Sequence, residues 1–261
     1  MQARSGRSPN GPLRQARHAM RPDPVAGDVA SMNPPLVADE LELLEALAPL
    51  DGARIVEAGC GAAQLARELL RRHPTAEVCA LEVDERQHAK NLAEPASRLH
   101  FQLAGAQEIP HADASFDGGL MLKSLHHVPA PLMDRALAEL ARVLRPGGWL
   151  YVSEPVYAGE FNELVRLFND EGAVRAAAQR ALDRAVASRC WEAAAERRFD
   201  TPVAFRDFAD FEARLMRPTF ADHRIDETLR ATVRSAFERY GGPDGARFLR
   251  PMHVRLLRRR R

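Results

Sequence analysis

The segment "EAGCGAAQ", residues 57–64, places a carboxylate and two glycines at the end of an apolar run. Because glycine has no side chain, Gly59 and Gly61 allow the backbone to approach a ligand closely, and they tolerate a positive φ. A helix that follows would present its free N–H groups to that ligand. A carboxylate at Glu57 would repel a pyrophosphate but would suit an ammonium group. The pattern therefore indicates a nucleoside that carries an amino acid.

Two other ligand classes that use a glycine turn fit this segment less well. A dinucleotide site expects a third small residue where Gln64 stands, counted from Gly59. A P-loop expects Gly-Lys followed by Ser or Thr, and this turn contains no lysine. Gln64 and Glu57 thus count against a nicotinamide-dependent oxidoreductase, which stays as a less favoured alternative.

The turn belongs to an alternation of strand and helix patterns that ends at Pro155. Apolar runs typical of buried strands alternate with amphipathic segments; the runs are ARIVEAG, AEVCALEV, LHFQLAG, SFDGGLMLKS and WLYVSEP. Strands joined through helices pair in parallel, and helices on both faces explain why each strand is apolar throughout. We predict an α/β fold with a doubly wound, mostly parallel, seven-stranded sheet around a core at residues 32–155.

The alternation of strand and helix patterns ends after the fifth strand pattern. Residues 159–198 carry apolar stripes at helical spacing, so we expect an inserted helical cap and substrate region at 156–220. Its many aromatic side chains, Phe220 among them, either pack these helices onto the sheet or also line an apolar pocket. We expect two more strands, in HRIDETL and RFLRPMHVRLL, to complete the sheet within 221–261.

The N-terminal segment and the composition limit the function classes. Residues 1–31 are rich in Arg, Pro and Gly, and we expect them to be disordered, with a mitochondrial presequence as the alternative. A net charge of +1 gives no electrostatic case for nucleic acid. No apolar run approaches the roughly 18 residues that would span a membrane. The chain's three cysteines lie far apart, which favours a reduced, cytoplasmic protein.

Four segments in order resemble the class I S-adenosylmethionine-dependent methyltransferases, in their small-molecule, type 11-like branch. The segments are VEAGCGAAQLA, CALEVD, AQEIPHADASFDGGLM and LAELARVLRPGGWLYVSEP, and the resemblance covers about residues 35–155. It implies a Rossmann-like methyltransferase fold, S-adenosyl-L-methionine as the cofactor, and methyl transfer to a small, partly apolar acceptor.

The resemblance also implies a set of cofactor contacts: Glu57, Gly59, Gly61, Glu82, Ala106, Gln107 and Lys123. Glu82 ends the second strand, where a carboxylate would accept hydrogen bonds from both ribose hydroxyls. The backbone carbonyl of Lys123 would face the methionine end, with its side chain in solvent. The backbone N–H of Ala106 and the side chain of Gln107 would meet the adenine edge.

The sequence departs from the family pattern at two positions. Ala63 stands where a third glycine is usual, and Gly105 stands where an acid usually binds the adenine amino group. The Gly105 change favours an alternative function, in which a relative binds the cofactor without catalysis and acts as a partner or regulator.

Methyl transfer needs alignment more than it needs a particular catalytic residue. The nucleophile must lie about 3–3.5 Å from the methyl carbon, and a base helps only when a hydroxyl or thiol loses a proton. His126 and His127, after the fourth strand, are candidates for that base, or one of them caps or packs instead. Glu154, at the end of the fifth strand, would orient a substrate or pair with Arg166.

Other partners find little support in the sequence. The remaining histidines have no metal-ligand spacing, so we predict no metal site. The Asn/Asp-Pro-Pro-aromatic signature of amino methylation does not follow the fourth strand, where LKSLHH stands. We therefore expect no nucleic-acid or membrane partner. The sequence does not predict the oligomeric state.

Overall fold

The computed structural model describes residues 34–217 and 224–261, and Pro34–Arg261 form one compact unit. The expected disorder of residues 1–31 and the role of Phe220 lie outside the described residues. In the described part of the chain, no helix is both long and apolar enough to cross a membrane.

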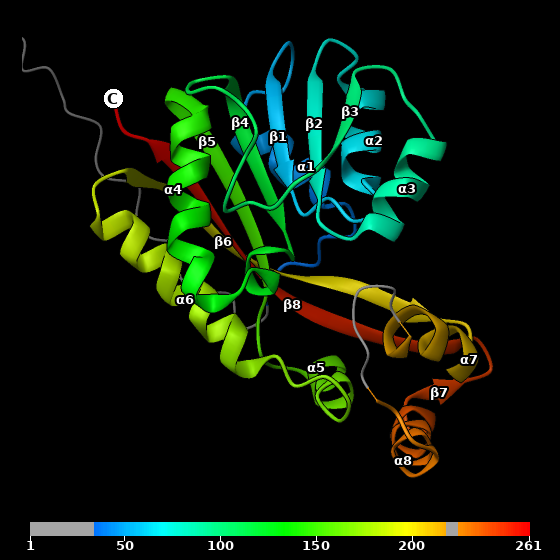
Figure 1. Cartoon of the computed structure of the whole chain (residues 1–261). Coiled ribbons are helices and arrows are strands. Elements are labelled where there is room, and N and C mark those ends of the chain that lie inside the picture. The colour runs from blue at the N-terminus through cyan, green and yellow to red at the C-terminus, as the bar shows by residue number, and fades with distance from the viewer. Residues whose placement is uncertain (1–33, 218–223) are drawn as a thin grey trace, which may run out of the picture. The chain divides into compact units, whose positions relative to one another are not determined.

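The central sheet has the order β3-β2-β1-β4-β5-β8-β6 (Figure 1). Its parallel strands are β1 (Arg54–Ala58), β2 (Glu77–Glu82), β3 (Leu99–Leu103), β4 (Phe116–Leu122) and β5 (Leu144–Pro155). The long strands β8 (Gly245–Arg259) and β6 (Trp191–Phe205) are antiparallel, and the short β7 (Gly241–Gly242) pairs with β8. The predicted α/β class and mostly parallel sheet are confirmed.

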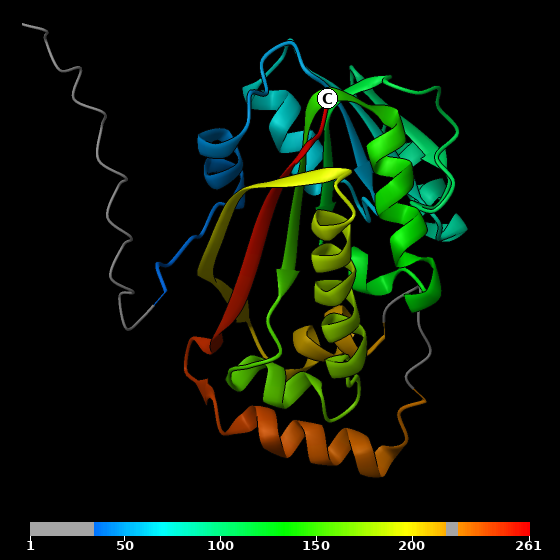
Figure 2. The same ribbon diagram turned by 90° about the vertical axis from the view of Figure 1, so that its left-hand side faces the viewer.

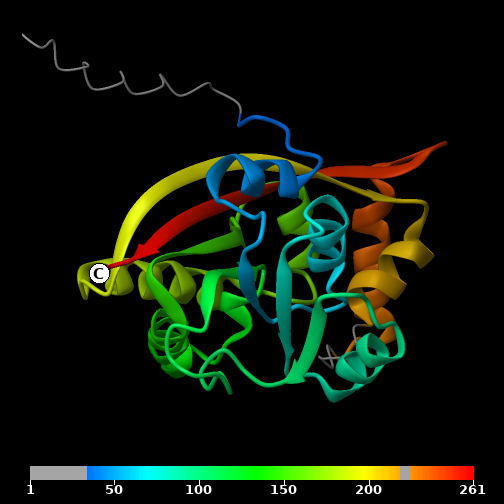
Figure 3. The ribbon, with the colours of Figure 1, turned by 90° about the horizontal axis from the view of Figure 1, so that it is seen from above.

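Helices cover both faces of the sheet (Figure 3). On one face, α1 (Glu40–Leu47) and α2 (Gln64–Arg72) pack in a core that includes Ile55. On the other face, α4 (Met133–Val143) and α6 (Gly172–Ala187) pack in a core that includes Val56. Because neighbouring strand residues point to opposite faces, burial on both sides explains the continuous apolar runs. The helix α3 (Glu85–Ala93) packs near β2 and β3.

The remaining helices cluster at the far ends of β6 and β8 (Figure 2). They are α5 (Glu160–Val165), α7 (Phe208–Phe211), the π-helix η3 (Glu212–Met216) and α8 (Glu227–Glu238). A third core of aromatic side chains joins them, in which Phe205 lies 5.1 Å from Phe211, centroid to centroid. The short helices η1 (Leu125–His127) and η2 (Ala130–Leu132) follow β4.

The secondary structure predicted for the part of the chain after Pro155 was wrong in two places. Residues 159–198 are helical only through α5 and α6, because Trp191–Phe205 forms β6 and pairs with β8 along its whole length. An alanine-rich segment has helix propensity, but this long ladder of strand pairing overrides it. Residues 224–229, the described part of HRIDETL, do not form a strand: Asp226 caps α8 by accepting a hydrogen bond from the Leu229 N–H at 2.7 Å. The strand predicted at RFLRPMHVRLL is confirmed within β8.

Candidate active site

The glycine turn follows β1 with the predicted backbone conformation. The φ angles of Gly59 and Gly61 are 75° and 53°. A Cβ atom on Gly59 would lie 2.7 Å from the Cβ of Ser124, so only glycine lets the turn approach the segment after β4. Ala63 has a φ of 53° without being glycine. The turn therefore forms with alanine at the position of the family's third glycine.

Glu57 lies at the end of β1 and is a buried carboxyl group with an unsatisfied oxygen. Only 3% of the residue is exposed, and its Oε2 has no hydrogen-bond partner among residues 34–217 and 224–261. Burial raises the pKa of Glu57 to about 8; the charge of Lys123 acts against this shift and that of Glu82 adds to it. Buried polar atoms are normally paired. An ammonium group would satisfy this oxygen, so the site fits the amino-acid end of S-adenosylmethionine.

Glu82 ends β2, and its carboxylate is fixed by the backbone. Its Oε2 accepts a hydrogen bond from the Gly61 N–H at 2.8 Å. Its Oε1 accepts from the N–H groups of Val83 and Asp84 at 2.8 and 2.9 Å. A carboxylate has about four acceptor positions. Three are occupied here, so Glu82 holds the glycine turn as well as offering an acceptor to a ribose hydroxyl.

The loop after β3 presents an amide where the family has an acid. A Cβ atom on Gly105 would lie 2.5 Å from both Nε2 and Oε1 of Gln107, so the Gln107 side chain lies over Gly105. Ala106 beside it is buried. An amide offers both a donor and an acceptor to a base edge. The use of Gln107 at the adenine stays a prediction.

Lys123 follows β4 in a left-handed conformation, with a φ of 54°. Its N–H donates to the Ser153 carbonyl at 2.7 Å. Its Nζ lies 3.7 Å from Oε2 of Glu40, and its charge lowers the pKa of Glu57. The side chain is 41% exposed, in line with the expected solvation, and it also takes part in the electrostatics of the turn.

His126 and Glu154 form a buried pair beside the turn. The Nδ1 of His126 is hydrogen-bonded to Oε2 of Glu154, and Oε1 of Glu154 accepts from the Leu125 N–H at 2.9 Å. Both side chains are almost fully buried. Of the two roles considered for Glu154, the ion pair with Arg166 is not formed, because Arg166 pairs with Glu163 at 2.8 Å.

Glu171 and Arg175 complete this cluster, and the sequence analysis missed both. Oε2 of Glu171 lies 3.8 Å from Nε2 of His126 and 2.6 Å from Nη2 of Arg175. Burial acts to raise the pKa of Glu171, but the charges of His126 and Arg175 outweigh it and lower that pKa. The i, i+4 spacing of Glu171 and Arg175 was the only sequence signal.

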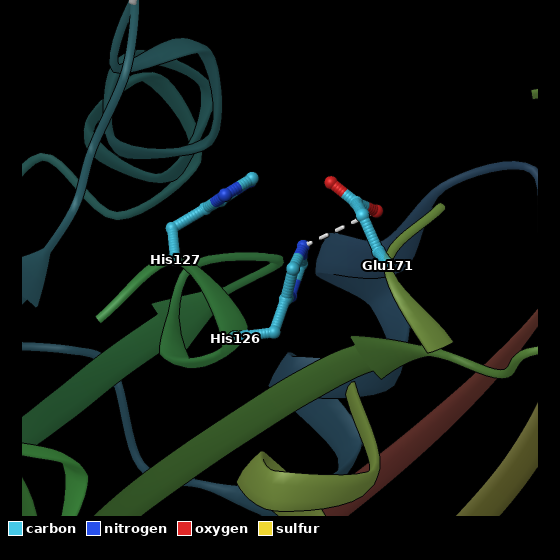
Figure 4. Close-up of side chains that lie close together, drawn as sticks. All are labelled: His126, His127 and Glu171. Carbon is cyan, nitrogen blue, oxygen red and sulfur yellow. Dashed lines mark ion pairs between the residues drawn. The ribbon is translucent and has the colours of Figure 1, made fainter. Parts of the chain in front are cut away.

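His127 lies against His126 and faces the same space as Glu171 (Figure 4). The centroids of the two histidine rings are 4.1 Å apart. His127 as a whole residue is exposed, although its imidazole ring is partly shielded from water. This shielding and the charge of His126 lower the pKa of His127 below the usual 6.5. A lowered pKa keeps the imidazole neutral at pH 7, so it can accept a proton.

The same three side chains also form a set of potential metal ligands. One ligand atom each of His126, His127 and Glu171 lies within 4.8 Å of the others. Two imidazoles and a carboxylate suit a divalent transition metal. However, the Glu171 oxygen nearest to His126 already binds the guanidinium of Arg175. The prediction of no metal rested on spacing along the sequence, which cannot detect this set.

Residues 56–152 match the family model described as a methyltransferase domain. O-methyltransferase cnsE of Penicillium expansum is 35% identical over 118 residues, which are 42% of this chain and 41% of that protein. Methyltransferase GfsG of Streptomyces halstedii is 33% identical over 147 residues, 52% of this chain and 51% of that protein. The chain thus spans about half, or less, of the length of these relatives.

Two solved structures share the fold. The YcgJ protein of Bacillus subtilis has a TM-score of 0.58 at 18% identity, over 85% of this chain and 98% of that one. A putative methyltransferase of Bacillus halodurans has a TM-score of 0.59 at 14% identity, over 85% and 99% of the two chains. The chain therefore has the Rossmann-like fold of these structures, and residues 56–152 match the model of a methyltransferase domain.

Proposed function

We propose that this protein transfers a methyl group from S-adenosyl-L-methionine to a hydroxyl group of a small, partly apolar acceptor. The observation that carries the proposal is the contact between the two halves of the site. Gly59 lies directly against Ser124, and the Ser124 hydroxyl donates to the Ala58 carbonyl at 2.7 Å. The turn with the unsatisfied Glu57 therefore adjoins the segment that carries His126 and His127, at the edge where open α/β sheets bind ligands.

The residues of the turn bind and orient the cofactor in this proposal. Glu57 pairs with the ammonium group, Glu82 accepts from the ribose, and Gln107 meets the adenine. When bound, S-adenosylmethionine supplies a methyl group that its sulfonium already activates. The protein's main task is then to hold the acceptor oxygen in line with that methyl group.

His127 is the proton acceptor that we propose. Its lowered pKa keeps it neutral at pH 7, and the residue is exposed. His126 acts as a positioning residue that Glu154 holds in place. A proton acceptor is needed when the nucleophile is a hydroxyl. The names of the O-methyltransferases that match this chain support oxygen as the methylated atom.

A non-catalytic cofactor-binding protein is the second candidate, and one observation favours it. Gly105 removes the usual acid, and a neutral amide, Gln107, lies over that position. The nicotinamide alternative is weaker, because the unsatisfied carboxyl of Glu57 would face a pyrophosphate. We keep a cytoplasmic location and the absence of nucleic-acid and membrane partners as proposals that rest on composition.

Methyl-labelled S-adenosylmethionine tests the proposal. The whole protein is incubated with it and with phenols, aliphatic alcohols and amines of matched size, and the label in each acceptor is counted. We expect label on the oxygen of hydroxyl-bearing acceptors and not on the amines. Tight binding of the cofactor without transfer to any acceptor would contradict the proposal in favour of the non-catalytic alternative.

A further inference from the structure

The backbone of Gly61, in the glycine turn, is held by side chains from two other elements. Nδ2 of Asn91, on α3, donates a hydrogen bond to the Gly61 carbonyl at 2.8 Å. Only 3% of Asn91 is exposed. The N–H of Gly61 donates to Oε2 of Glu82, at the end of β2, at 2.8 Å. Both backbone polar groups of this glycine are therefore fixed from outside the turn.

Gln87 lies one turn earlier on the same helix and fixes the orientation of the Asn91 amide. Its Nε2 donates to Oδ1 of Asn91 at 2.9 Å. A carbonyl oxygen can only accept a hydrogen bond, so the nitrogen of Asn91 faces Gly61 and the oxygen faces Gln87. Nδ2 of Asn91 also lies 3.7 Å from Sγ of Cys60. The buried amide thus has hydrogen-bond partners on both sides in a single orientation.

The first turn of α3 is tied to the same site. Asp84 caps the helix by accepting from the Arg86 N–H at 2.9 Å. The N–H of Asp84 donates to Oε1 of Glu82 at 2.9 Å. The helix is therefore attached to Glu82 at its first turn and to Gly61 at its last. These attachments fix the position of the glycine turn relative to the end of β2.

The contact with Asn91 also sets the direction of the next backbone N–H group. In a trans peptide, the C=O and N–H groups point in opposite directions. Because the Gly61 carbonyl points to Asn91, the N–H of Ala62 points away from α3, and Ala62 is exposed. Gly61 has a φ of 53° and no side chain that would oppose rotation of this peptide. The hydrogen bond from Asn91 is thus what keeps the peptide from turning over.

We propose that Asn91, held by Gln87, is a positioning residue for S-adenosylmethionine. It keeps the peptide between Gly61 and Ala62 in the orientation that offers the Ala62 N–H to the cofactor and leaves Glu82 in place for the ribose. This role rests on the proposed function, since it concerns the same cofactor site. Asn91 acts only through the turn. Its loss should therefore weaken cofactor binding and leave the methyl-transfer step unchanged.

Calorimetric titration of the whole protein with S-adenosylhomocysteine tests this role in Asn91→Asp and Asn91→Ala. We expect each variant to bind at least about tenfold more weakly than the wild type. Asn91→Asp should bind no better than Asn91→Ala, because it keeps the size of the side chain but places an acceptor against the Gly61 carbonyl. Lys90→Ala is the matched control, since Lys90 is exposed on the same helix, and it should bind as the wild type does.

Two further readouts separate positioning from a folding defect. A variant that only folds less completely shows fewer binding sites per chain with the wild-type Kd. A misplaced turn shows the full number of sites with a raised Kd, which is the result we expect. Gln87→Leu leaves Asn91 present and should raise the KM for S-adenosylmethionine about two- to fivefold in the labelled-methyl assay. Its kcat and its KM for the acceptor should equal those of the wild type.

Several outcomes would overturn the role of Asn91. They are a wild-type Kd in Asn91→Ala, a Kd of Asn91→Asp between those of the wild type and Asn91→Ala, or a lower kcat with an unchanged cofactor KM in Gln87→Leu. The role of Asn91 and the proposed function can fail separately. A wild-type Kd in both Asn91 variants of a protein that transfers methyl groups would refute only the role of Asn91. Weakened binding in both, with no methyl transfer by the wild type to any acceptor, would refute only the proposed function.

Discussion

The proposed cofactor half and acceptor half of the site are held together by different kinds of contact. At the cofactor half, the turn after β1 and the end of β2 work mainly through backbone: three backbone N–H groups hold Glu82, and Glu57 keeps one unsatisfied oxygen. At the acceptor half, side chains hold one another, as His126 does with Glu154 and Glu171 with Arg175. The cofactor half lies within residues 57–107, whereas the acceptor half gathers residues from 126 to 175.

This difference indicates how strongly amino-acid substitutions would alter the binding properties of each half. A backbone turn presents the same N–H groups whatever most of its side chains are, so it suits a ligand that is always the same. A network of side chains changes its shape and charge with single substitutions, so it suits an acceptor that differs between proteins that share a fold. The comparison predicts that substitutions at the acceptor half change the rate, and that those at the cofactor half change affinity and stability.

The largest effect should come from His127→Ala. We expect kcat to fall about 100- to 1,000-fold, as is typical of losing a general base, while the affinity for S-adenosylhomocysteine is unchanged. The wild-type rate should fall at acid pH, because the base must be unprotonated and its pKa lies below 6.5. Initial rates from pH 5 to 8 measure this. His100→Ala, at an exposed histidine on β3, is the control, and a full rate in His127→Ala would refute the assignment.

Glu57→Gln should act mainly on stability, with a clear dependence on pH. The folded protein raises the pKa of Glu57 from 4.5 to about 8, so wild type loses stability as pH rises between these values. The glutamine variant has no such charge to bury. We expect it to gain about 2 kcal/mol or more over wild type at pH 8 relative to pH 5. Urea unfolding at both pH values tests this, and an equal difference at both would show that the carboxyl is not buried as described.

A smaller effect is expected at Ala63, where the backbone is left-handed without glycine. Ala63→Gly relieves about 1–2 kcal/mol of conformational cost but loses a buried methyl group, worth about 0.8 kcal/mol, and adds chain entropy to the unfolded state. The free energy of unfolding should therefore change by less than about 1 kcal/mol. A loss greater than about 2 kcal/mol would mean that this methyl group matters more to packing than the turn does.

Chelation should have the smallest effect of all. Arg175 already occupies the Glu171 oxygen that a metal would share with His126, so we expect EDTA to leave the initial rate unchanged. If EDTA abolished activity and added Mn²⁺ or Zn²⁺ restored it, the result would contradict this expectation. It would show that His126, His127 and Glu171 bind a metal, in place of the proposed proton transfer.

The position of the glycine turn could be predicted from the sequence, because the turn directly follows an apolar strand. Gly59, Gly61 and Glu82 stand at strand ends that apolar runs and family motifs both locate. The acceptor half could not be predicted, because its residues come together only through tertiary structure. Glu171 reaches His126 from the residue before α6, and the antiparallel pairing of β8 with β5 and β6 extends the sheet beyond its parallel strands. That pairing also converts an alanine-rich segment from a predicted helix into β6.

The central claim is that the turn at Glu57 and the carboxylate of Glu82 bind the nucleoside of S-adenosylmethionine. Isothermal titration of the whole protein with S-adenosylhomocysteine tests it most directly, with Glu82→Ala and NADH as controls. We predict micromolar binding by the wild type, loss of that binding in Glu82→Ala, and no binding of NADH. Failure of the wild type to bind S-adenosylhomocysteine, or binding of NADH in its place, would contradict the account and leave the methyltransferase likeness as one of fold alone.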